Sequence, residues 1–236
     1  MSIAGQHAVV VGGTAGIGLA IARAAHAAGA RVTVASRSRD KVDRAVASLE
    51  GAQGLRLDLT DVDEVQRAFA SLGDIDHLVV TAAEVRAGAF RELSITDAQH
   101  SMASKFWGPY VAARAARVRN SGSITLFSGI FAKRPSPGFA VLSAINAAVE
   151  SLGRALAVEL APIRVNVISP GLIRDTDALA GMSEAARESL FSATAERLPV
   201  RRVGTPSDVA ALVLAIMDNP YMTGATVEID GGGSLL

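Results

Sequence analysis

Cysteine does not occur in this chain of 236 residues. Disulfides, thiol nucleophiles and cysteine-ligated metals are therefore excluded, and a reducing compartment such as the cytoplasm is compatible with the sequence. The four histidines and the carboxylates show no ligand spacing such as His-Glu-x-x-His. We expect a cytoplasmic protein that needs no metal.

Net charge is also missing, since 23 basic residues balance 23 acidic ones and no basic stripe stands out. Nucleic-acid-binding proteins usually carry a basic face, so we expect a small-molecule partner and no nucleic acid. No uninterrupted apolar run approaches the roughly 18 residues of a membrane span. No charged leader with an apolar stretch precedes the first strand-like segment at His7, so neither secretion nor contact with a membrane is expected.

Aliphatic residues are abundant: half of the chain is hydrophobic, although only 4% is aromatic. Short β-branched runs alternate with alanine-rich helical stretches, and most of these runs are continuously apolar, which is typical of parallel strands covered on both faces. The sequence therefore predicts an α/β fold of Rossmann type, a doubly wound, seven-stranded parallel sheet with helices on both faces, in a single domain over residues 1–236. The predicted strands are 7–11, 31–35, 54–57, 77–80, 123–127, 164–168 and 226–229, and the predicted helices are 16–28, 40–49, 61–71, 96–119, 139–160 and 206–218, with helix starts at Thr60, Thr96 and Thr205.

Two segments carry expectations beyond the fold. Residues 140–160 are apolar almost all round, which indicates that one face meets the sheet and another meets a second subunit. We therefore expect a homodimer or homotetramer, with an unusually well-covered monomer as the alternative. Residues 174–203 are polar and alanine-rich without a strand pattern, and we expect them to form a mobile helical flap over a ligand cleft.

A glycine cluster follows the first predicted strand directly and opens a helix. Gly12, Gly13, Gly16 and Gly18 occur in the order strand, cluster, helix. Glycines at these points allow a tight turn, let backbone N–H groups approach a pyrophosphate and let the helix pack closely on the strand. The helix N-terminus then faces the anion. This context predicts a dinucleotide site, whereas a glycine cluster alone could be a purely structural turn.

The spacing G-x-x-x-G-x-G of residues 12–18 resembles the short-chain dehydrogenase/reductase (SDR) family, whose motif is T-G-x-x-x-G-x-G. Val11 stands where the threonine is usual. The resemblance covers nearly the whole chain, through residues 58–59, 80–83, 165–171 and 204–232. It implies that Pro170 and Gly171 form the turn beside the nicotinamide.

The end of the second predicted strand indicates which nicotinamide nucleotide is bound. About 20 residues beyond the glycines, an acidic residue would hold the ribose of NAD(H), and a basic one would receive the 2′-phosphate of NADP(H). Here Arg37 stands between Ser36 and Ser38, and no carboxylate occurs before Asp40. A planar guanidinium beside hydroxyls suits a phosphate, so NADP(H) is predicted. The alternative is that Arg37 and Arg39 are solvated charges in a loop.

The resemblance also implies that Asp58 binds the adenine amino group, although an aspartate there could instead cap the helix that starts near Thr60. The predicted cofactor-binding residues are Gly12, Thr14, Gly16, Ile17, Gly18, Ser36, Arg37, Ser38, Asp58, Leu59, Thr81, Ala82, Ala83, Pro170, Gly171 and Ile173.

The catalytic tetrad of the family is changed at every position. In the family, a tyrosine donates the proton, aided by a lysine four residues later, a serine thirteen residues earlier and an asparagine on the preceding helix. Residues 146–149 resemble the family's K-A-A-V, so the lysine and tyrosine positions fall on Asn146 and Leu142, the serine position on Gly129 and the asparagine position on Lys105. Leucine has no proton to give. The chain is therefore identified as an atypical family member that lacks the Asn-Ser-Tyr-Lys tetrad.

Lys105 is the leading candidate for another proton donor, because burial near a cationic nicotinamide would lower the pKa of its ammonium. The alternative is a structural lysine that binds backbone carbonyls of the fifth strand. Ser128 is a second candidate, although strand alternation would turn its side chain to the opposite face. Tyr110 lies about 140° around the helix from Lys105 and should not share the site.

Two functions follow from this pattern. The first is an NADP(H)-dependent oxidoreductase of the SDR type that acts on a small carbonyl or alcohol with a non-tyrosine proton donor. The second is a catalytically inactive NADP(H)-binding sensor or partner subunit, since fold and function are separable. The intact glycine turn fits both functions.

Overall fold

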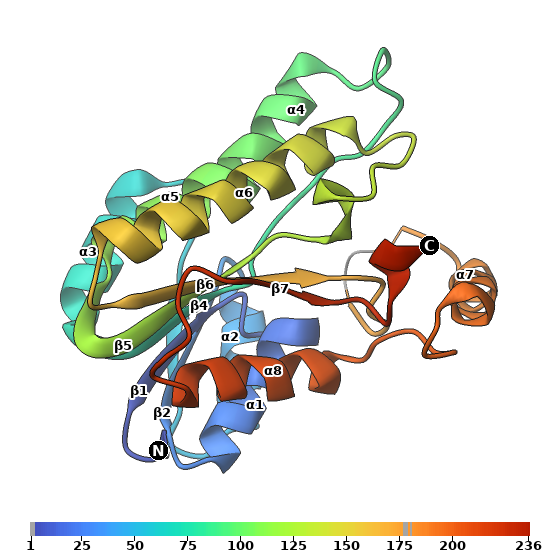
Figure 1. Ribbon diagram of the computed structural model, residues 1–236. Helices are drawn as coiled ribbons and strands as arrows, with labels where there is room; N and C mark the ends of the chain where they lie inside the picture. Colours follow the sequence, from blue (N-terminus) through green and yellow to red (C-terminus); the bar gives the residue numbers. More distant parts are fainter. Residues whose placement is uncertain (1–2, 177–178, 180) are drawn as a thin grey trace.

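The computed structural model describes residues 3–176, 179 and 181–236, and these form the predicted doubly wound fold (Figure 1). Seven parallel strands make one sheet in the order β3-β2-β1-β4-β5-β6-β7. All seven predicted strands are confirmed, with bounds that differ by a few residues. They are β1 (His7–Val11), β2 (Arg31–Ser36), β3 (Gln53–Arg56), β4 (Asp74–Val80), β5 (Arg117–Phe127), β6 (Arg164–Pro170) and β7 (Thr226–Ile229).

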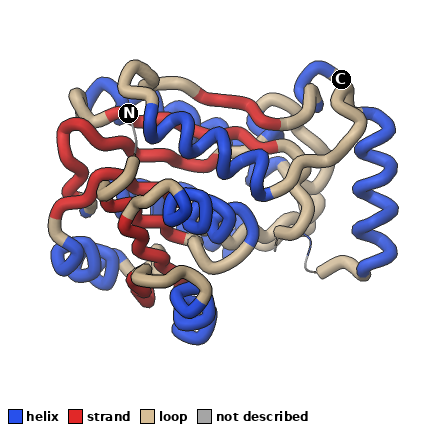
Figure 2. Tube along the Cα trace, turned by 90° about the horizontal axis from the view of Figure 1, so that it is seen from below, coloured by secondary structure: helices blue, strands red, loops and turns tan. Residues whose placement is uncertain are grey.

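Helices cover both faces of this sheet, as Figures 1 and 2 show from two directions. One face packs against α1 (Gly16–Ala27), α2 (Arg39–Ala47) and α8 (Pro206–Asp218). The other packs against α3 (Val62–Leu72), α5 (Gly108–Ala115) and α6 (Ala140–Glu159). The remaining helical segments are α4 (Ile95–Met102), η1 (Ala103–Trp107), η2 (Ile130–Ala132), α7 (Glu184–Arg197) and η4 (Gly233–Leu235).

The central strands are apolar on both sides because each side faces a helix layer. In β1, Ala8 and Val10 join the core on the α1 side, and Val9 and Val11 join the core on the α5 side. This alternation follows from the two-residue period of a strand. Each of these side chains is at most 1% exposed, and burial of a valine contributes about 1.5–3 kcal/mol.

The predicted helix 96–119 is wrong as one continuous element. The structure divides it into α4, the π-helical turn η1 and α5, and the next strand begins at Arg117. Residues 117–118 pair with 74–75 of β4, and the guanidinium of Arg117 lies 2.9 Å from Asp74. This long-range pairing outweighs the local helical pattern. Single π-helical turns often occur at functional sites, and Lys105 lies in this one.

One of the three predicted helix starts is correct. Thr205 is the N-cap of α8, where it forms a capping box with Asp208. The other two helices begin differently: Asp61, one residue after Thr60, caps α3, and Ser94, two residues before Thr96, caps α4. In both cases a stronger N-cap residue stands nearby and accepts the hydrogen bond.

Helix α6 meets the sheet closely. A Cβ atom added at Gly153 would lie 2.3 Å from Cγ2 of Val167, so only glycine allows this approach to β6. By length and composition α6 could also cross a membrane, but its inner face packs on the sheet core through Ile145 and Val149. Its outer face leaves Val158 82% exposed.

The segment 174–203 contains the helix that the sequence predicts there. In both views α7 stands at the side of the sheet beside the C-terminus (Figures 1 and 2). Phe191 is the only buried residue of this helix. Residues 177, 178 and 180 of this segment lie outside the described residues. The segment begins against the glycine turn, since a Cβ atom added at Gly16 would lie 3.4 Å from the backbone of both Asp175 and Thr176.

Candidate functional site

The glycine turn lies at the carboxyl end of β1, between β2 and β4. The strand order changes direction at this point, because β2 and β3 lie on one side of β1 while β4 to β7 lie on the other. In open α/β sheets, ligands bind in the crevice at the carboxyl ends of the strands at such a switch point. The sheet topology therefore locates the candidate site at the glycine turn.

Two glycines let the turn pack closely. Gly12 has a φ of +89°, and a Cβ atom there would lie 2.5 Å from the hydroxyl oxygen of Thr81. Gly18 sits in the first turn of α1, where a Cβ atom would lie only 2.1 Å from the carbonyl oxygen of Gly12. Thr81 donates its backbone N–H to the carbonyl of Val11 over 2.9 Å, which ties the end of β4 to this turn. Any larger side chain at Gly12 or Gly18 would open the turn.

The N-terminus of α1 has no side-chain cap, a feature that it shares with α6 but not with α2, α3 or α8. Its N-cap residue is Ala15, whose side chain cannot accept a hydrogen bond, and its first turn carries no acidic residue. In contrast, α2, α3 and α8 have a Ser, Asp or Thr cap and an aspartate in the first turn. The first backbone N–H groups of a helix lack partners inside the helix and carry partial positive charge. At α1 they remain available to an external anion such as a pyrophosphate.

A hollow of about 290 Å³ adjoins this turn, between α1 and α2. Thr14 and Ala15 of the turn form one wall, and Arg23, Lys41 and Arg44 bring three positive charges to it. Sequence reasoning missed these three cations. Lys41 and Arg44 are three residues apart on α2 and therefore lie on one face of that helix. The sequence does not reveal that α1, which carries Arg23, lies opposite that face.

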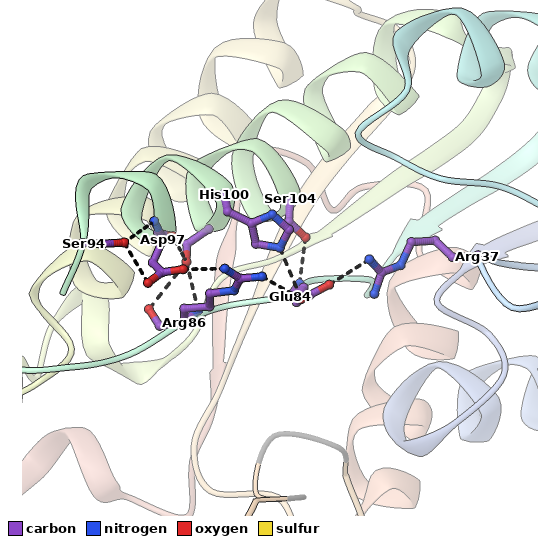
Figure 3. A network of polar contacts seen from close by, with 8 residues as sticks. Arg37, Glu84, Arg86, Ser94, Asp97, His100 and Ser104 are labelled. Carbon is purple, nitrogen blue, oxygen red and sulfur yellow. Dashed lines mark hydrogen bonds and ion pairs between the residues drawn. The ribbon is translucent and has the colours of Figure 1, made fainter.

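Arg37 follows the end of β2 directly and forms an ion pair across the candidate site. Its Nη1 atom lies 2.7 Å from Oε2 of Glu84, in the segment that follows β4 (Figure 3). The two side chains are 56% and 38% exposed. The sequence analysis did not consider Glu84. Ser38, another predicted cofactor contact, is the N-cap of α2 and accepts a hydrogen bond from the N–H of Lys41.

Asp58 stands at the end of β3 and organises the turn that follows it. Its Oδ1 atom accepts hydrogen bonds from the N–H and the hydroxyl of Thr60, at 2.9 and 2.8 Å. Burial raises the pKa of the Asp58 carboxyl, but the hydrogen bonds from Thr60 and the charge of Arg37 outweigh it, so the net pKa is below the usual value. The alternative that Asp58 caps α3 is wrong, because Asp61 is that cap.

The ammonium of Lys105 lies at the carboxyl end of β5. Its Nζ atom donates to the carbonyl of Ser128 over 3.1 Å and to that of Phe127 over 3.4 Å. These are the contacts that the structural alternative for Lys105 expects. Burial also lowers the pKa of Lys105 to about 8, which brings the ammonium within the range of a useful acid.

The hydroxyl of Ser128 points to a different partner. It donates to Oε1 of Glu150 on α6 over 3.1 Å, and Ser128 is only 5% exposed. Strand alternation predicts that the side chain of Ser128 points away from Lys105. Accordingly, the backbone carbonyl of Ser128, and not its hydroxyl, contacts the ammonium of Lys105. The structure does not bring the two candidate catalytic side chains together.

The three other residues predicted to stand at the tetrad positions are Asn146, Gly129 and Leu142. Asn146 is 1% exposed and donates from Nδ2 to the carbonyl of Gly129 over 3.2 Å, while its Oδ1 atom has no hydrogen-bond partner among the described residues. A Cβ atom added at Gly129 would lie 3.0 Å from that Nδ2 atom, so a glycine at 129 fits the asparagine at 146. Leu142 lies one helical turn earlier on α6 and is partly buried.

Two further groups of predicted cofactor residues lie at the same edge of the sheet. Ala82 donates its backbone N–H to the carbonyl of Val11, beside Thr81. Pro170 is the last residue of β6, and Gly171 after it donates its N–H to the carbonyl of Ile229. Ile173 is buried and forms an isolated bridge with Gly204. The other predicted positions lie in or beside these segments: Ile17 in α1, Ser36 at the end of β2, Leu59 after β3 and Ala83 after β4.

The two tyrosines lie away from this group. Tyr110 packs its ring against Trp107, with ring centroids 5.6 Å apart, and Tyr221 is 96% exposed. Among residues 3–176, 179 and 181–236, no cluster of three or more histidine, aspartate or glutamate side chains could hold a metal ion.

Comparison with known proteins gives consistent matches over the whole chain. A family model described as "Enoyl-(Acyl carrier protein) reductase" matches residues 12–234. The chain is 32% identical to "Short-chain dehydrogenase/reductase ATR9" of Stachybotrys chlorohalonatus, with 99% of each chain covered. It is 35% identical to human "Dehydrogenase/reductase SDR family member 4", covering 98% of this chain and 88% of that protein.

Solved structures are similar as well. The structure superposes on a small-chain dehydrogenase crystallised in complex with NADPH with a TM-score of 0.86, at 36% identity, covering 98% of this chain and 100% of that chain. It superposes on a structure described as a betaketoacyl-ACP reductase with a TM-score of 0.89, at 32% identity, covering 99% of this chain and 100% of the other.

Proposed function

This chain belongs to the short-chain dehydrogenase/reductase family of oxidoreductases, and from that premise we propose that it binds NADP(H) and reduces or oxidises a small carbonyl or alcohol. One observation carries the proposal: the uncapped N-terminus of α1 and the glycine turn lie together at the switch point of the sheet. The similar dehydrogenase that was crystallised with NADPH supports this cofactor.

The preference for NADP(H) rests on positive charge beside the adenosine end of the site. Arg37 stands at the end of β2, where the 2′ position of the ribose lies in doubly wound folds. The hollow beside Thr14 adds Arg23, Lys41 and Arg44. A phosphate oxygen accepts charge-assisted hydrogen bonds from such groups, which a ribose hydroxyl cannot match.

Lys105 is our proposed proton donor. A bound nicotinamide nucleotide would supply a hydride to the substrate carbon in reduction, or accept a hydride from it in oxidation. The ammonium of Lys105 would then protonate the developing alkoxide oxygen in reduction, and its neutral amine would take that proton back in oxidation. The carbonyls of Phe127 and Ser128 orient the Nζ atom, and its pKa of about 8 allows both protonation states near neutral pH.

Two further parts belong to this proposal. The segment 174–203, including α7, is proposed to act as the flap over the site, because its first residues lie against Gly16 of the glycine turn. The outer face of α6, with Val158 82% exposed, is proposed to pack against a second copy of the chain.

Binding calorimetry with NADPH and NADH tests the cofactor. Arg37→Gln should weaken NADPH binding about ten- to hundredfold, because a charge-assisted contact to the 2′-phosphate is lost, and should leave NADH binding nearly unchanged. Arg39→Gln is the matched control, since Arg39 is exposed in the first turn of α2, two residues from Arg37, and pairs with Asp43. Equal losses for both nucleotides would remove the 2′-phosphate argument. Folded wild-type protein that binds neither nucleotide would overturn the proposal.

Activity distinguishes an enzyme from a sensor. The wild-type protein should oxidise NADPH with at least one member of a panel of aldehydes, ketones and quinones, and Lys105→Ala should lose that rate while it still binds NADPH. Binding without any turnover would instead support the inactive sensor or partner subunit.

A further inference from the structure

Glu84 is a partner of Arg37 that the sequence analysis did not identify. The two residues follow β2 and β4, which flank β1 in the sheet. Their ion pair, in which Nη1 of Arg37 lies 2.7 Å from Oε2 of Glu84, therefore spans the carboxyl end of β1, where Gly12 begins the glycine turn. In doubly wound folds the adenosine half of a dinucleotide lies at this place. A 2′-phosphate bound by Arg37 would therefore have to share this guanidinium with Glu84.

We infer that Glu84 competes with the 2′-phosphate of NADP(H) for Arg37 and thereby sets how strongly the protein prefers NADP(H) over NAD(H). This inference rests on the proposed function. NADP(H) binding requires Arg37 to exchange a carboxylate for a phosphate, whereas NAD(H), which has no phosphate at this position, can bind with the pair intact. Glu84 is a specificity-determining residue in this arrangement.

The carboxylate of Glu84 has two further neighbours on the side opposite Arg37. Its Oε1 atom lies 3.3 Å from Nε2 of His100 and 3.9 Å from Nη2 of Arg86 (Figure 3). Its backbone N–H donates to the hydroxyl of Ser104 over 2.7 Å. Glu84 therefore stays near the site when Arg37 turns to a phosphate, and its charge continues to act on that phosphate.

Arg86 is itself fixed, so it cannot follow Glu84 freely. Its guanidinium pairs with Asp97 in the first turn of α4, and its backbone N–H donates to the hydroxyl of Ser101 over 2.9 Å. In Figure 3 these groups lie on one side of Glu84 and Arg37 lies on the other. After the exchange, Arg86 and His100 still face the carboxylate, which keeps the cost of releasing Arg37 low.

The size of the effect follows from the exposure of the pair. Arg37 and Glu84 are partly exposed, and ion pairs of this kind contribute little to stability. Release of Arg37 from Glu84 should therefore change NADPH affinity only about two- to fivefold. Salt screens exposed charges, so the effect should be larger at low ionic strength.

The test is the dissociation constant of NADPH and of NADH, measured by calorimetry for the full chain at low and high salt. Glu84→Gln should tighten NADPH about two- to fivefold and change NADH by less than about twofold, so the NADPH/NADH preference rises. Glu50→Gln is the matched control, because it removes the same charge from the exposed turn that follows α2. Thermal melts of both variants check that the fold is intact.

Arg37→Gln provides the second background. In that variant, Glu84→Gln should change NADPH affinity less than it does in the wild type, since the competition for Arg37 is gone. An unchanged or lower NADPH/NADH preference in Glu84→Gln would overturn the inference while leaving the proposed function standing. If folded wild-type protein binds neither nucleotide, the proposed function and this inference both fail.

Discussion

The Nζ atom of Lys105 lies 3.1 Å from the carbonyl oxygen of Ser128, so a residue of the π-helical turn η1 is tied to the end of β5. Here burial lowers the pKa of the ammonium to about 8. The same contact fits a structural tie and a positioned acid, because both need a fixed ammonium. Kinetics as a function of pH can separate the two roles.

If Lys105 donates the proton, the rate of NADPH-dependent reduction should depend on its charged form. The rate should be level below pH 8 and fall about tenfold per pH unit above it, because the acid is progressively deprotonated. Lys105→Arg keeps the positive charge but cannot release its proton in this range, so this variant should lose most of the rate, and any residual rate should lack the fall. A wild-type rate that stays level to pH 10, or a Lys105→Met variant with the wild-type rate, would rule out the role.

The hydroxyl of Ser128 should matter for stability more than for turnover. Ser128→Ala leaves Oε1 of the buried Glu150 without this donor, which should cost about 1–3 kcal/mol in the free energy of unfolding. Urea denaturation measures the loss, and Ser71→Ala, whose hydroxyl lies at the surface of α3, is the control. We expect the rate to stay within about twofold. A large loss of rate without loss of stability would instead place this hydroxyl in catalysis.

Gly18→Ala should damage both folding and nucleotide binding. A methyl group there would lie 2.1 Å from the carbonyl oxygen of Gly12, so α1 must move away from the turn. Overpacking of this kind costs about 1–3 kcal/mol, and the displaced helix N-terminus should weaken NADPH at least tenfold. Gly88→Ala is the control, since an added Cβ atom there would lie 3.6 Å from the nearest atom of Leu93, an ordinary van der Waals contact. Wild-type NADPH affinity in Gly18→Ala would contradict the role of the turn.

Acid should destabilise the protein through His77, far from the candidate site. His77 is 1% exposed and contacts Ser123 and Gln6, and desolvation lowers its pKa from 6.5 to about 4. The unfolded chain therefore binds the proton more readily than the native protein. The stability that this histidine contributes is fully present above pH 6.5 and is lost as the pH falls through 4.

Urea titrations between pH 7.5 and pH 4 check this expectation. The difference in pKa corresponds to about 3 kcal/mol at most, so His77→Gln should be less stable at pH 7.5 but should lose less of its stability in acid. His26→Gln, which removes a histidine near the surface, should keep the wild-type slope. A wild-type slope in His77→Gln would show that other groups cause the acid sensitivity.

Local patterns in the sequence were sufficient to predict the sheet and the glycine turn. The continuous apolar strands required cover on both faces, and the order of strand, glycines and helix required a switch-point site beside β1. Thr205 followed by a proline likewise predicted a helix start correctly. The helix predicted over 96–119 failed, because the pairing of Arg117 with β4 depends on residues far away in the chain.

Some features of the site likewise follow from the sequence, whereas others depend on the tertiary structure. The sequence by itself determined that Arg37 stands at the end of β2 and that Leu142 cannot donate a proton, since both follow from residue type and local spacing. Only the tertiary structure decided that Glu84 faces Arg37 and that Lys105 reaches the end of β5. These contacts join side chains from separate strands and helices, and the packing of those elements against one sheet fixes the distances between their charges.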